Sequence, residues 1–358
     1  MTREKGAGGH GGRWLLLGLL AAAALLAGAD SPAAFGAEAG FAGGGAAMTR
    51  PAAGDLAAAQ SPDGEVAVGA QAGAAAGQTG AQPGESEEAA QARLMALYEK
   101  MVRFNLDNPR TVPSATIDSL MALRESLPLG ERIAAWADYF WRRGDASYLF
   151  GLADGGYCKE GRLVDDFHTD CVLFFYRVTE LGRSSSALEA VQFAFGTRFY
   201  GAILEDVVDG QGRVDYDNAV HLDYSEDLVR SGIWGQDVTA QLGEPAADQA
   251  GTTRYPSGTV QYLPKERVDY GALRDGDVIW FVCDEKTEAG RKLRESGTMI
   301  GHLGIIEVEQ GEPQLIHAAA KGLSGLYAGG KIEKVPLKTY LARVETFKGL
   351  IATRIENF

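Results

Sequence analysis

Three residues of this chain could together perform nucleophilic catalysis, namely Cys171, His302 and His317. Asp170 and Cys171 head the amphipathic run Cys-Val-Leu-Phe-Phe-Tyr-Arg-Val, which predicts a helix that begins at the cysteine. A helix N-terminus presents unpaired N–H groups and a positive dipole, so we expect a lowered thiol pKa and a nucleophilic thiolate. The histidines lie in apolar, β-rich runs on either side of a turn, where neighbouring strands would present both imidazoles to one cysteine. This pattern indicates a Cys-His-His hydrolase.

A metal site is the rival use of the same residues, because two imidazoles and a thiolate can bind zinc. The chain has no HExxH or CxxC spacing, so neither a metal nor another cofactor is predicted. The histidines are 317 − 302 = 15 residues apart, which suits opposite positions on a hairpin better than one helix face. Cys158 and Cys283 could form a disulfide that leaves Cys171 free, although spacing does not establish the pairing.

Residues 1–29 are typical of a signal peptide. Basic residues precede an apolar run, and Ala27-Gly28-Ala29 offers the small residues that a signal peptidase reads. We therefore expect an exported protein of the periplasm or the extracellular cell envelope. An uncleaved segment would instead tether the chain to the membrane.

The rest of the chain divides into two parts by composition. Residues 30–90 consist mainly of Ala, Gly, Gln, Ser and Pro, which predicts a disordered tether because little apolar surface can be buried. Residues 91–358 are long enough for one domain with a substantial core. The formal net charge of −14 argues against binding to nucleic acid or to an anionic membrane, and no stable protein partner is evident.

Periodicity predicts helices first and strands afterwards. Residues 91–145 form a helical part with three apolar stripes, a loop follows over 144–169, and the cysteine helix ends at Gly182. Ser186 and Glu189 form a capping-box pattern that opens another helix. Strands are predicted at 278–282, 302–308, 314–318 and 347–355, with a hairpin connection at 310–313. This order predicts an α+β fold with helices on an antiparallel sheet.

The middle of the chain, from Tyr200 to Pro264, is polar and rich in turns. It contains His221, Asp223 and Tyr224, a mixture of aromatic and polar residues that is typical of a cleft wall and equally of an ordinary surface.

The order of these motifs resembles the NlpC-type papain-like cell-wall hydrolases, and within them the N-acetylmuramoyl-L-alanine amidase-like family. The principal matches are Asp170-Cys171, Leu273-Arg-Asp-Gly-Asp-Val-Ile-Trp-Phe281, His302-Leu-Gly-Ile-Ile306 and Leu315-Ile-His-Ala318. Smaller similar pieces are Gly130-Glu-Arg-Ile133, Leu163-Val164, Asp223-Tyr224-Ser225 and Asp237-Val-Thr239, so the resemblance covers most of residues 130–358. The chain departs from the amidase-like pattern at Leu173, Tyr176 and Ala319, where that pattern has Thr, Glu and Ser.

The resemblance implies a papain-like fold with the cysteine at a helix N-terminus and the histidines on an antiparallel sheet. It implies that Cys171 attacks an amide carbonyl, that His302 transfers the proton and that His317 orients His302, without a cofactor. The Cys171 N–H, helped by Tyr157, would bind the oxyanion. The bond cleaved would join N-acetylmuramic acid to L-alanine of the stem peptide in muropeptides.

Two other functions remain open from the sequence. One is a stem-peptide endopeptidase of the same superfamily, and the other is a non-catalytic envelope binding protein. For the amidase we expect the substrate contacts to come from Tyr157, Asp170, His221, Asp223 and Tyr224. An endopeptidase would make no use of His221, Asp223 and Tyr224.

Overall fold

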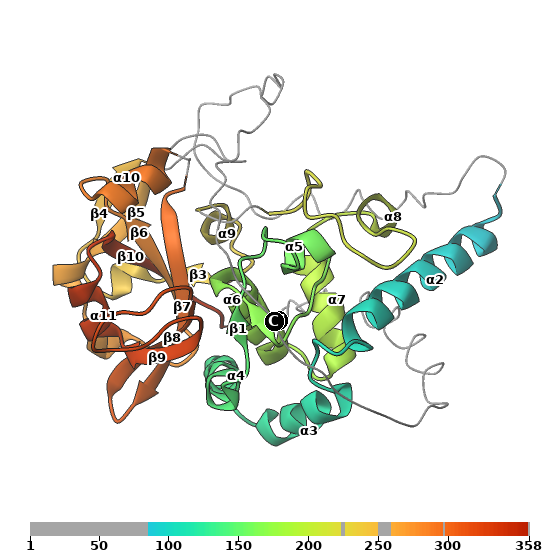
Figure 1. Ribbon diagram of the computed structural model, residues 1–358, viewed down its shortest axis with the longest axis horizontal. Helices are drawn as coiled ribbons and strands as arrows, with labels where there is room; N and C mark the ends of the chain where they lie inside the picture. The colour runs from blue at the N-terminus through green and yellow to red at the C-terminus, as the bar shows by residue number, and fades with distance from the viewer. Residues whose placement is uncertain (1–84, 223–225, 250–258, 296–297, 357–358) are drawn as a thin grey trace, which may run out of the picture. The chain divides into compact units, whose positions relative to one another are not determined.

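The computed structural model describes residues 85–222, 226–249, 259–295 and 298–356 (Figure 1). The chain divides into two units, residues 1–67 and 68–358, and all the described residues belong to the second. This second unit has an α+β fold with a large, mostly antiparallel sheet, as the order of the sequence patterns predicts. No helix among the described residues is long and apolar enough to cross a membrane.

Three helices form the N-terminal part, in agreement with the predicted apolar stripes. They are α2 (Glu87–Leu106), α3 (Ser114–Arg124) and α4 (Leu129–Arg143). Helix α4 buries Ile133, Trp136 and Phe140 on one face and ends at Gly144, whose φ of 69° is easily adopted without a Cβ.

The central helix, α6 (Cys171–Gly182), begins at the cysteine and ends at the predicted glycine, and all its residues are buried. A buried helix can carry charges only if they are paired. Its Arg177 pairs with Asp166, and its Glu180 accepts hydrogen bonds of 2.8 and 2.7 Å from Arg198. Arg198 is the last residue of α7 (Ala187–Arg198), whose N-cap Ser186 accepts from the Glu189 N–H.

The remaining helices are short. They are α5 (Tyr157–Glu160), α8 (Leu204–Val207), α9 (Glu226–Arg230), α10 (Glu288–Glu295) and α11 (Leu337–Arg343), with 3-10 turns at Thr239–Gln241, Lys265–Arg267 and Tyr270–Ala272.

Ten strands form one sheet in the order β2-β1-β9-β8-β7-β6-β10-β5-β4, with β3 beside β10. Strands β1 and β2 pair in parallel and the other pairs are antiparallel. Their bounds are β1 Ser147–Tyr148, β2 His168–Thr169, β3 Gln236–Asp237, β4 Ala246–Gln249, β5 Thr259–Pro264, β6 Val278–Cys283, β7 Ile300–Glu309, β8 Glu312–Ala319, β9 Lys331–Pro336 and β10 Phe347–Arg354.

The two faces of this sheet bury different cores, because successive side chains of a strand point to opposite faces. On one face Trp280 of β6 and Leu303 of β7 pack with α4 and α6. On the other face Phe281 packs with α11 and its Tyr340. The face on which each histidine and the cysteine lies therefore decides which of these side chains can meet.

The turn between the two histidine strands is shorter than the predicted connection. It consists of Gln310 and Gly311, with φ of 52° and 84°, between Glu309 of β7 and Glu312 of β8. Two consecutive positive φ angles are those of a type I′ turn, which matches the twist of an antiparallel hairpin. The predicted hairpin is thus confirmed.

Candidate functional site

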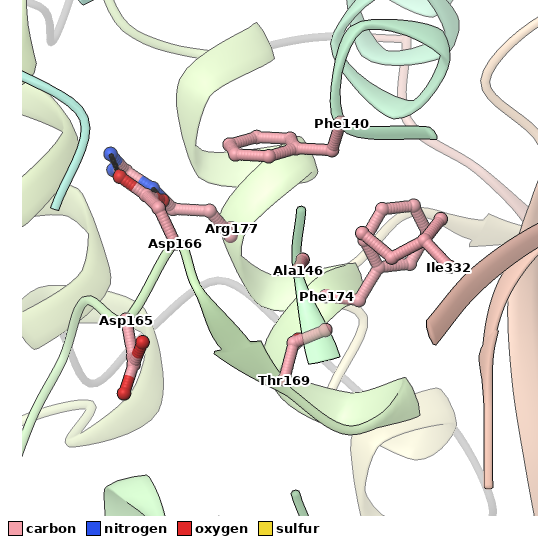
Figure 2. A pocket seen from close by; sticks show the side chains of 8 residues that line it. All are labelled: Phe140, Ala146, Asp165, Asp166, Thr169, Phe174, Arg177 and Ile332. Atoms are coloured by element: carbon pink, nitrogen blue, oxygen red, sulfur yellow. Dashed lines mark hydrogen bonds and ion pairs between the residues drawn. The ribbon is translucent and has the colours of Figure 1, made fainter. Parts of the chain in front are cut away.

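The cysteine helix is held in place by an ion pair on its side. Figure 2 shows Arg177 beside Asp166 at a small cavity that Phe140 and Phe174 also line. The Asp166 carboxylate accepts from Arg177 Nε at 2.8 Å and from Arg177 Nη2 at 3.2 Å, and its Oδ2 also accepts from the Val112 N–H at 2.8 Å. The lining of this cavity does not include Cys171, so its residues position α6 and do not form the reacting centre.

The start of α6 is fixed by the predicted cap, Asp170. Its Oδ1 accepts from the N–H groups of Val172 and Leu173 at 3.0 and 2.9 Å. Its Oδ2 accepts from the Gly151 N–H at 2.8 Å, which ties the loop after β1 to the helix. Because both oxygens of this buried carboxylate bind backbone N–H groups, the structure gives Asp170 a positioning role.

The backbone N–H groups of Leu303, Cys171 and Val172 lower the pKa of the Cys171 thiol, as expected at a helix N-terminus. Burial nevertheless raises the pKa of the Cys171 thiol, and the neighbouring Asp170 carboxylate raises it further. The lowered thiol pKa expected from the helix N-terminus is therefore wrong for this structure, because the cost of burying a thiolate outweighs the N–H groups.

His302 and His317 form a hydrogen-bonded pair. His302 lies on β7 and His317 on β8, and the distance between His302 Nε2 and His317 Nδ1 is 2.7 Å. The β7–β8 pairing starts with Ile305 opposite Ile316 and runs toward the turn, so both histidines lie just beyond it. The prediction that neighbouring strands bring the two imidazoles together is confirmed.

The imidazoles and α6 lie against opposite faces of the sheet. His302 stacks on Phe281 with ring centroids 5.9 Å apart, and His317 meets the Tyr340 ring edge-on at 5.1 Å. The residue that follows His302 on β7 is Leu303, whose side chain lies in the same core as Cys171. Tyr340 lies on the side of the imidazoles, with its ring centroid 6.3 Å from that of His302.

Both imidazoles are neutral at neutral pH. Burial lowers the pKa of His302 to about 4, and burial together with His302 lowers the pKa of His317. Since Nε2 of His302 is bonded to His317, Nδ1 is the nitrogen that remains to accept a proton. The neutral imidazole of His302 can therefore act as a general base, and the Cys171 thiol is still protonated at neutral pH.

Sequence reasoning missed Tyr148, which its strand places near the start of α6. Tyr148 pairs with Thr169 in the two-residue strands β1 and β2, two residues before Cys171. Its pKa is raised by burial and by negative charge at Cys171 and Asp170. Two-residue strands leave no periodic signal, so only the predicted loop over 144–169 could have pointed to this position.

Two of the residues predicted to contact substrate, Tyr157 and His221, pack against the Tyr216 ring. The Tyr157 side chain is buried, and its ring meets the Tyr216 ring edge-on at 5.3 Å. His221 packs against Phe199 and Tyr216 with ring centroids 5.3 and 4.9 Å apart. The other two predicted contacts, Asp223 and Tyr224, lie outside the described residues.

The proposed disulfide is not formed. All three cysteines are free thiols, and Cys158 packs against a different core from Cys283. In the part of the chain that the structure describes, one group of acidic, His or Cys side chains is close enough to share a metal ion: Asp138, Glu307 and Glu309. The ammonium of Lys334 already contacts all three carboxylates.

Comparison with known proteins finds similarity only among solved structures. No family model and no curated protein matches the chain. A Legionella pneumophila protein with the family designation DUF1460 is 17% identical, with a TM-score of 0.48 over 68% of this chain and 94% of that one. An N-acetylmuramoyl-L-alanine amidase from Bacteroides uniformis is 18% identical, with a TM-score of 0.44 over 64% of this chain and 99% of that one.

Proposed function

We propose that this protein is an exported cell-wall hydrolase with a papain-like fold that cleaves the amide between N-acetylmuramic acid and L-alanine of muropeptides. The observation that carries the proposal is the 2.7 Å hydrogen bond between His302 and His317, together with a cysteine that begins the capped helix α6. A nucleophile, a base and a group that orients the base are the three parts that thiol acyl transfer requires.

The first half-reaction follows from the protonation states. As the Cys171 sulfur attacks the amide carbonyl, Nδ1 of His302 takes the thiol proton, and the new C–S bond leaves a tetrahedral oxyanion. The imidazolium then donates this proton to the leaving amine as the C–N bond breaks, which gives a thioester and the free peptide. The neutral His302 can accept at pH 7 because burial holds its pKa at about 4.

The second half-reaction releases the sugar. Nδ1 of His302 takes a proton from water, the hydroxyl adds to the thioester carbonyl, and the thiol is restored when the C–S bond breaks. The Cys171 N–H and the Tyr148 hydroxyl are the donors best placed for the oxyanion, since Tyr148 lies near the start of α6 and Tyr157 is buried in another cluster.

The choice of bond rests on the motifs that resemble the amidase-like family. Two positions that depart from that pattern, Leu173 and Tyr176, are buried in the core, so these substitutions change the packing around α6 and leave the Cys-His-His set complete. The alternatives are a stem-peptide endopeptidase and a non-catalytic binder. A binder has no use for a buried, hydrogen-bonded histidine pair and a cysteine at a capped helix start.

Mass spectrometry of digested muropeptides tests the proposal. The wild-type protein should release a free peptide that begins with L-alanine, and Cys171→Ala should release none while it keeps the far-UV spectrum of the wild type. Cys158→Ala is the matched control, because it removes a free thiol outside the site. Products cut within the stem, with the sugar still joined to L-alanine, would identify an endopeptidase.

A further inference from the structure

The loop after β1 exposes two large apolar side chains next to the nucleophile. Phe150 is 53% exposed and Leu152 is 41% exposed. Among the described residues only three other large apolar side chains are prominently exposed: Leu123, Tyr200 and Ile203. An isolated exposed apolar residue is ordinary, but two on one loop close to the proposed reacting centre indicate a ligand-binding surface.

The loop cannot fold these side chains inward, because its backbone is fixed. The Leu149 N–H donates to the Thr169 carbonyl at 3.0 Å, and the Ala153 N–H donates to the Phe150 carbonyl at 2.9 Å. The intervening Gly151 is buried, and a Cβ there would lie 2.3 Å from the Tyr157 ring. Phe150 and Leu152 are therefore held outward by the close packing of the residue between them.

The same glycine brings the two side chains to the site. The Gly151 N–H donates to Oδ2 of Asp170, the residue that precedes Cys171, at 2.8 Å. Tyr148 is two residues before Phe150 and pairs with Thr169, which is two residues before Cys171. The segment thus carries a tyrosine near the start of α6 and then an apolar rim.

We infer that Phe150, with Leu152, is the platform that recognises the sugar ring of the substrate through the apolar C–H face of its pyranose. This inference rests on the proposed function, because the amide that Cys171 would cleave there is joined to the sugar through a short lactyl group. A flat aromatic ring complements the flat C–H face of a pyranose. The stem peptide presents carboxylates and backbone amides, which an apolar rim does not satisfy.

Binding to an inactive variant tests the platform without catalysis. In the Cys171→Ala background, Phe150→Ala should weaken the binding of N-acetylmuramoyl-L-alanyl-D-isoglutamine by about tenfold, the loss expected for one aromatic contact. Phe150→Trp should retain the affinity because it keeps a flat ring. Leu123→Ala, an exposed apolar residue of α3, is the matched control and should change nothing.

A sugar-free ligand separates the two proposals. N-lactoyl-L-alanyl-D-isoglutamine should bind Phe150→Ala and the parent Cys171→Ala protein equally. An equal loss for both ligands, or no loss for the muramoyl ligand, would overturn the platform even if the wild-type enzyme is active. If the wild-type protein cleaves neither compound but Phe150→Ala still weakens only the muramoyl ligand, the proposed hydrolysis fails and the sugar platform stands.

Discussion

Replacing Asp170 by Asn should separate the capping of α6 from the anchoring of the loop that carries Phe150. The Asn carbonyl can still accept from Val172 and Leu173, as Oδ1 does now. The amide NH2 would then face the Gly151 N–H, where Oδ2 now accepts at 2.8 Å. A donor would meet a donor at a buried position, and the loop would lose its bond to the helix.

The change in the free energy of unfolding follows from the hydrogen bond that is lost and the buried charge that is removed. A buried N–H left without an acceptor costs about 1–3 kcal/mol. Part of this is offset because Asn removes a buried charge, and burial already raises the pKa of Asp170. We therefore expect Asp170→Asn to lower the free energy of unfolding by about 1–2 kcal/mol, and Asp170→Ala, which also removes the cap, by about 2–4 kcal/mol.

Urea unfolding and steady-state kinetics are the assays. Besides the loss of stability, Asp170→Asn should reduce kcat/KM by about tenfold, because Tyr148 and Phe150 lose their fixed position relative to the sulfur. The control is Asp269→Asn, an exposed aspartate that accepts from the Gly271 N–H at 3.0 Å, which should cost less than about 0.5 kcal/mol. If Asp170→Asn lowers stability no more than Asp269→Asn, or leaves kcat/KM unchanged, the anchoring argument is wrong.

Three further predictions concern the reacting residues. Because burial raises the pKa of Cys171, iodoacetamide should alkylate this thiol slowly at pH 7 and faster only well above the ordinary thiol pKa of about 8.5. Rapid alkylation near pH 6 would refute the buried, protonated thiol. His302→Ala should reduce kcat at least about tenfold more than His317→Asn, since an amide can still accept the orienting hydrogen bond, and the reverse order would exchange the two roles. Above pH 6.5 the imidazole of His302 is neutral in both folded and unfolded chains, whereas between pH 6.5 and about 4 only the unfolded chain takes the proton. The stability of the wild type relative to His302→Gln should therefore fall as the pH is lowered through this window, and a constant difference in urea midpoints would contradict the lowered pKa.

The parts of the fold that the sequence predicts are those specified by local patterns. The Asp170 cap and the glycine at 182 lie at the ends of one periodic run, so the bounds of α6 are correct. The histidine strands and their turn are likewise adjacent in sequence. Strands β1 and β2 escape prediction because each has two residues and pairs with residues 21 positions away, Ser147 with His168. Strand β9 and helix α11, which complete the surroundings of His317, lie in a segment assigned no element.

The site residues also divide into those that the local sequence predicts and those that depend on how the chain folds. Cys171, His302 and His317 follow from residue type and spacing, and the structure pairs the two histidines and places the cysteine at the start of α6. Tyr157 was chosen for its nearness to the cysteine in sequence, but the sheet places Tyr148 there instead. The direction of the thiol pKa could not be predicted, because it depends on how much of the helix end the rest of the chain covers.

The hydrogen bond between the histidines limits where their protons can lie. For Nδ1 of His302 to act as a base, its Nε2 must carry the proton and donate to Nδ1 of His317. His317 then carries its own proton on Nε2, a buried atom that has no hydrogen-bond partner among the described residues. The rings of Tyr327 and Tyr340 meet this imidazole at steep angles, with centroids 5.3 and 5.1 Å from its own. These aromatic neighbours leave the bond to His302 as the hydrogen bond of the His317 imidazole among the described residues, and that bond is the contact that the proposed role of orienting the base requires.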